Sequence, residues 1–133
     1  MDIPDSLVIS RARGTSVEGM DPRVVEVFEE LRQSVRTLHL HVGELRVAIS
    51  RSGLPVKSGA LLLLESQQSV LQEVERELKN KPLTRRVEAL AISTVGVLPS
   101  LFNAVQKAAK GQEMPILDQC RRSLDELCGR LNF

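Results

Sequence analysis

The chain contains very few aromatic side chains: it has no tryptophan, no tyrosine and three phenylalanines among 133 residues. Proteins that bind single-stranded nucleic acids stack bases on aromatic rings, so this scarcity argues against such an activity. Neither sign of charge dominates, because 18 basic and 17 acidic residues leave a net charge of +1. A general electrostatic attraction to DNA or RNA is therefore not expected, and we predict no nucleic-acid partner.

Cysteines and long apolar runs are also scarce. Cys120 and Cys128 lie eight positions apart on one expected helix, a rise of about 12 Å, whereas a disulfide needs Cα atoms within about 7 Å. The N-terminus shows no secretory signal, and no uninterrupted apolar segment reaches eighteen residues. These features predict a reduced, soluble, cytoplasmic protein.

A long helical pattern is the main feature that is present. Apolar residues recur at alternating spacings of four and three: Val24, Phe28, Leu31, Val35, Leu38, Val42, Leu45 and Ile49. This spacing places one apolar stripe along about seven turns of helix. The same spacing returns between Leu117 and Leu131. We therefore expect coiled-coil-like packing of helix on helix.

Turn signals divide the chain into four helices. Asp21 and Pro22 form a strong helix start, and Gly53 and Pro55 stop that helix. Pro99 falls inside the third helix, where we expect a kink or a break because proline removes a backbone donor. The predicted helices span about 22–52, 56–80, 83–110 and 114–132.

Connections of only a few residues make consecutive helices antiparallel. The predicted fold is all-α, an up-down-up-down four-helix bundle over residues 21–133, preceded by a flexible N-terminal tail over residues 1–20. The second helix is expected to bury two adjacent stripes, which together form a broad face. Their residues are Val56, Ala60, Leu63, Val70 and Val74 in one, and Leu61, Leu64, Leu71 and Leu78 in the other.

Polar residues interrupt these stripes at mid-bundle. Gln67 and Gln68 of the second helix lie at the height of Thr94 on the third and of His39 to His41 on the first. This layer would hold a small ligand or metal, or it would form hydrogen bonds that set helix register. We favour the second interpretation, because the inward Glu residues and Glu-x-x-His pairs of bundle metal sites are absent.

No motif for catalysis accompanies the polar layer. His39 and His41 are two positions apart, so their side chains point about 160° away from each other on a helix and cannot share a metal. Neither histidine has a serine or cysteine whose placement suggests a nucleophile. We expect no enzyme activity, no catalytic residue, no metal and no cofactor.

Exposed aliphatic residues provide the functional hypothesis. Leu40 and Val47 are seven positions apart on the face of the first helix opposite its core stripe, and Leu62 has a similar place on the second helix. Such residues mark a surface that a partner helix or another copy covers. The sequence predicts a non-catalytic interaction module, an adaptor, scaffold or oligomerisation domain that binds a protein partner or forms a homo-oligomer.

Basic residues cluster around the second turn at Lys79, Lys81, Arg85 and Arg86. We expect this basic turn to steer the approach of the partner. The alternative function is a helical-bundle signalling or effector domain that docks through basic turns on an anionic membrane surface or a phosphorylated partner. Partner-helix binding would depend on the aliphatic residues, whereas membrane docking would fail at raised salt.

Overall fold

The computed structural model describes residues 22–80 and 84–131. Lys81, Leu83 and the predicted tail over residues 1–20 lie outside the described residues. Four helices account for most of the described chain: α2 (Pro22–Ser52), α3 (Ser58–Asn80), α4 (Arg85–Ala109) and α5 (Pro115–Leu131).

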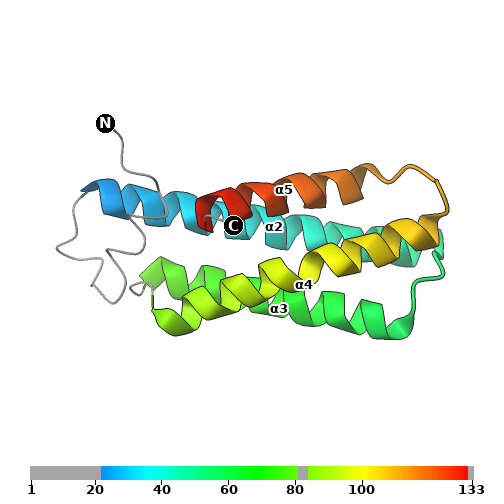
Figure 1. The fold of residues 1–133 in the computed structure, drawn as a ribbon, viewed down its shortest axis with the longest axis horizontal. Helices are drawn as coiled ribbons and strands as arrows, with labels where there is room; N and C mark the ends of the chain where they lie inside the picture. The colour runs from blue at the N-terminus through cyan, green and yellow to red at the C-terminus, as the bar shows by residue number, and fades with distance from the viewer. Residues whose placement is uncertain (1–21, 81–83, 132–133) are drawn as a thin grey trace.

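The four helices form a bundle in which each helix runs antiparallel to the one before it (Figure 1). Helix α2 packs against α3 and α5, and α4 packs against the same two helices. Helices α2 and α4 therefore occupy opposite corners. The described residues contain no strand, and the predicted all-α four-helix bundle is confirmed.

The core is aliphatic and follows the predicted stripe of α2. Residues Val35, Leu38, Val42 and Leu45 are completely buried on this helix. The other helices supply the facing side chains, namely Leu64 and Leu71 from α3, Leu98 and Phe102 from α4, and Leu127 and Cys120 from α5. Burial of this apolar surface is the main force that holds the four helices together.

Helix α3 corrects one expectation about its buried face. Leu63 is 48% exposed, so its predicted place in an inward stripe is wrong. The buried stripe is the narrower series Leu64, Gln67, Leu71, Val74 and Leu78, which keeps the helical spacing of three and four. Successive residues of a helix are rotated by about 100° around its axis, so the side chain of Leu63 points about 100° away from that of Leu64 and lies outside this stripe.

Helix α4 begins and ends at recognisable caps and continues through its proline. The Thr84 hydroxyl accepts a hydrogen bond from the backbone N–H of Val87 at 3.2 Å, and Lys110 closes the helix in the left-handed conformation. Of the kink or break expected at Pro99, the break is wrong, because the helix is continuous from Arg85 to Ala109, and the kink stays a prediction. Its neighbours Leu98, Leu101 and Phe102 are buried, and this packing holds the turns on both sides of the exposed proline.

Helix α4 is also long and apolar enough to cross a membrane, as judged by length and composition alone. Within the bundle, its apolar side chains Val95, Leu98, Phe102 and Val105 are buried. The core helix of a helical bundle has this same character.

Candidate partner-binding surface

The structure brings the three predicted aliphatic residues to one surface. Leu40 and Val47 of α2 are 52% and 49% exposed, and Leu62 of α3 is 66% exposed. Two adjoining hollows of about 640 and 630 Å³ contain them, and both hollows include Gly43, Val47 and Gln68 in their walls. We call this surface the outer groove, formed by Leu40, Gly43, Val47, Leu62 and Gln68.

Gly43 forms the floor of the outer groove. A Cβ atom at this position would lie 2.8 Å from Gln68 Nε2, so any other residue would displace the end of the Gln68 side chain from its present place against α2. The Gln68 side-chain oxygen in turn accepts a hydrogen bond from the Arg46 guanidinium. Sequence analysis missed Gly43. An isolated glycine inside a helix costs about 1 kcal/mol of stability relative to alanine, so its presence in the predicted first helix could have indicated a close contact there.

Two charged side chains of α2 flank the outer groove. Glu44 and Arg51 are exposed and line the same hollow as Leu40 and Val47. Neither makes an ion pair or a side-chain hydrogen bond with another described residue. Their charges are therefore available to a molecule that covers the groove.

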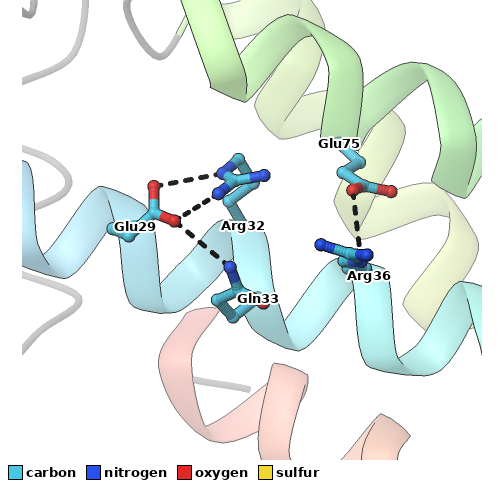
Figure 2. Close-up of polar contacts among 5 residues, drawn as sticks. All are labelled: Glu29, Arg32, Gln33, Arg36 and Glu75. Carbon is cyan, nitrogen blue, oxygen red and sulfur yellow. Dashed lines mark hydrogen bonds and ion pairs between the residues drawn. The ribbon is translucent and has the colours of Figure 1, made fainter.

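Charges in the N-terminal half of α2 are arranged differently. Glu29 accepts hydrogen bonds from Arg32 and from Gln33, and Arg36 approaches Glu75 of α3 at 4.0 Å (Figure 2). The hydrogen bonds from Arg32 and Gln33 lower the pKa of Glu29. Glu29, Arg32 and Arg36 are thus paired within the chain.

The basic turn lies far from the outer groove. Leu62 is near the start of α3 and Lys79 is in its last turn, so the two are separated by about 25 Å along the helix axis. Lys79, Arg85 and Arg86 are exposed, and Arg86 donates a hydrogen bond to Glu73 at 2.5 Å. That hydrogen bond lowers the pKa of Glu73. The structure thus separates the two groups of predicted partner-binding residues, and one cation of the turn is paired.

The polar layer is present between α3 and α4. The Thr94 hydroxyl donates a hydrogen bond to Gln67 Oε1 at 2.9 Å, and both side chains are buried. Gln68 instead lies at the surface with His39, on the wall of the outer groove. The buried pair satisfies polar atoms that would otherwise be costly, and it sets the register of the two helices.

His41 contacts a serine of α5. Its Nδ1 atom lies 2.5 Å from Ser123 Oγ of α5, a partner that the sequence pattern did not indicate. The two residues are 82 positions apart, and only the pairing of α2 with α5 brings them together. Ser123 is 5% exposed, and His41 makes no hydrogen bond to a carboxylate among the described residues. A catalytic serine needs access to substrate, which this buried contact lacks.

Helix α5 has further polar contacts with α2 and carries the cysteines. Arg130 donates hydrogen bonds to Ser34 and to Glu30, each at 2.8 Å.

Burial raises the pKa of the Cys120 thiol to about 12, with a smaller contribution from the charge of Glu44. Such a thiol is inert at neutral pH. No group of three metal-ligating side chains occurs within residues 22–80 and 84–131.

Comparison of the chain with protein-family models, with curated proteins and with solved structures finds no significant match. The four-helix bundle and the chemistry of its surface are therefore the basis for a functional proposal.

Proposed function

We propose that this bundle is a non-catalytic protein–protein interaction module, acting as an adaptor, scaffold or oligomerisation domain in the cytoplasm. The observation that supports this function is the outer groove, where exposed aliphatic side chains of two helices line one continuous surface. Burial of apolar surface contributes about 25 cal/mol per Å², so covering Leu40, Val47 and Leu62 stabilises a complex.

The groove geometry suits an amphipathic helix. A helix lying between α2 and α3 presents apolar residues at positions i, i+3 or i+4, and i+7, and inserts them between rows of side chains. Gly43 removes one side chain from the floor, which allows a close approach there. The flanking charges of Glu44 and Arg51 provide polar contacts at the rim.

A membrane-docking function has weaker support. It would rely on the basic turn, where Arg86 is already paired with Glu73. The other described cations of the basic turn are Lys79 and Arg85. Each basic residue near an anionic membrane contributes about 1 kcal/mol of electrostatic attraction, so these two give little binding energy. We therefore favour a protein partner.

The test is a selection of displayed amphipathic helical peptides on the purified bundle, followed by anisotropy measurements. We expect a selected peptide to lose at least about tenfold in affinity for the Leu40→Glu, Val47→Glu double variant, since an unpaired charge in an apolar contact costs more than 1.4 kcal/mol. The control is Ile92→Glu, an equally drastic change at a 39% exposed aliphatic residue of α4.

Unchanged affinity of the double variant would overturn the proposed groove. Failure of every peptide, together with salt-sensitive binding to vesicles of phosphatidylserine that Arg85→Gln weakens, would favour the membrane function instead.

A further inference from the structure

We infer that the occupant of the outer groove is a second copy of this chain, which places its own α2 antiparallel to α2 across a two-fold axis beside Val47. This inference rests on the proposed function and specifies its partner. In a two-fold interface the same patch serves both copies, so residue i contacts residue j and residue j contacts residue i. The patch must therefore be complementary to itself.

The flanking charges meet this requirement. Glu44 and Arg51 are seven positions apart, so they lie on nearly the same side of α2 and about 10 Å apart along its axis. A two-fold axis perpendicular to α2 makes the second copy's α2 antiparallel to the first. The two helices then face each other with the side that carries Glu44 and Arg51. With the axis midway between the two residues, each Glu44 meets the Arg51 of the other copy, and two ion pairs form.

The apolar residues fit the same register. Val47 lies next to the axis and faces the Val47 of the second copy. Leu40 then lies just past the last turn of the second copy's α2, beside the segment that holds Leu54, a half-buried residue that lines the second hollow. Leu62 borders the same hollow on α3, where it covers the helix of the second copy. Every aliphatic residue of the outer groove gains an apolar neighbour.

Other registers are less favourable. An axis midway between Leu40 and Val47 would place Arg36 opposite Arg51, and like charges at an interface cost several kcal/mol. An axis at Leu40 would require Arg36 and Glu29 as partners for Glu44 and Arg51. Both are engaged within their own chain, Arg36 with Glu75 and Glu29 with Arg32 (Figure 2). The unpaired charges thus select the axis beside Val47.

Charge exchange tests the inference directly, with mass measured by light scattering over a range of concentrations. We expect the unmodified chain to form a dimer in a concentration-dependent manner. Glu44→Arg alone and Arg51→Glu alone each create two like-charge contacts and raise the dimer Kd at least about tenfold. The combined Glu44→Arg, Arg51→Glu variant restores opposite charges at both contacts, and its dimer returns.

Mixing the two single variants provides a second test that is independent of their separate behaviour. A chain with Glu44→Arg and a chain with Arg51→Glu have complementary charges across the axis, so we expect a heterodimer where each variant alone is monomeric. The matched controls are Glu113→Arg and Lys107→Glu, which make the same changes in net charge at exposed positions outside the groove. Circular dichroism verifies that every variant is folded.

The outcomes separate this inference from the proposed function. An unmodified chain that stays monomeric and still binds helical peptides through the outer groove overturns the second copy and leaves the interaction module in place. The antiparallel arrangement is also overturned if the dimer Kd is unchanged in the Glu44→Arg and Arg51→Glu variants, or if the control substitutions raise it equally. A monomer that binds no helical peptide overturns both proposals.

Discussion

Three hollows of nearly equal volume flank α2, two that form the outer groove and one beside α5, and they differ in the residues that line them. The outer groove lies between the C-terminal half of α2 and α3, and its walls combine exposed aliphatic residues and a glycine with four charged residues, Glu44, Arg46, Arg51 and Glu65. The other hollow, of about 640 Å³, lies between the N-terminal half of α2 and α5. Four glutamates and one arginine dominate its walls, namely Glu26, Glu29, Glu30, Glu126 and Arg130.

Volume alone therefore does not identify a binding surface. Covering the outer groove removes aliphatic surface from water, which is favourable. Covering the acidic hollow with an apolar helix would instead remove hydrated carboxylates from water, a cost of several kcal/mol per ion. Arg130 already uses the acidic hollow to join α5 to α2 through Glu30 and Ser34. The acidic hollow is therefore part of the internal structure, whereas the outer groove keeps its aliphatic residues exposed.

The largest expected effect contrasts the two faces of α2. Leu45→Ala removes a fully buried side chain and should lower the free energy of unfolding by about 2–5 kcal/mol. Val47→Ala, only two positions away on the outer groove, should change it by less than about 0.5 kcal/mol. Urea denaturation at high dilution measures both. Equal losses would show that Val47 belongs to the core.

Neighbouring glutamines of α3 provide the next contrast. Thr94→Val removes the donor to the buried Gln67 amide and should cost about 1–3 kcal/mol of unfolding free energy. Gln67→Leu combined with Thr94→Val should recover most of this loss, because no polar atom is then left unpaired. Gln68→Ala, at the groove wall, should cost less than Thr94→Val. A double-mutant cycle in urea reports these values, and strict additivity of the two buried substitutions would contradict the pairing.

The α5 side of α2 should respond to alkaline pH through Cys120. Its pKa rises from 9.0 in an exposed thiol to about 12 in the fold, so the folded state keeps a proton that the unfolded state loses above pH 9. Stability is complete below pH 9 and falls as pH rises toward 12, by at most about 1.4 kcal/mol per unit. The comparison is between the chain and Cys120→Ala from pH 8 to pH 10. Parallel pH profiles would contradict this assignment.

Glycine substitutions give the smallest change in stability and sharpen the description of the groove floor. Gly96→Ala, where an added methyl group meets no atom within 4 Å, should raise the free energy of unfolding by up to about 1 kcal/mol. Gly43→Ala gains the same helix propensity but must displace the flexible end of Gln68, so its net change should be smaller. Dimerisation or peptide binding should fall for Gly43→Ala only. An equal effect of both substitutions on binding would exclude Gly43 from the groove.

Much of the architecture was predictable because its signals are local. The apolar stripe of α2 became the buried stripe from Phe28 to Ile49, and each helix begins or ends close to a proline, glycine or capping residue. Local signals were less informative on α3, where consecutive leucines put apolar side chains on two neighbouring faces and the pattern does not select which face is buried. The choice of Leu64 over Leu63 depends on the angle at which α2 and α4 contact that helix.

Local sequence patterns were enough to predict the four helices, their aliphatic core and the exposure of Leu40, Val47 and Leu62, since helical periodicity and turn chemistry act over only a few residues. Which of these residues share a surface depends on how the helices pack together. The meeting of Val47 with Leu62, the place of Gln68 over Gly43 and the contact of His41 with Ser123 all join different helices. Their geometry depends on the rotation of each helix about its axis, which the packing of the whole core sets.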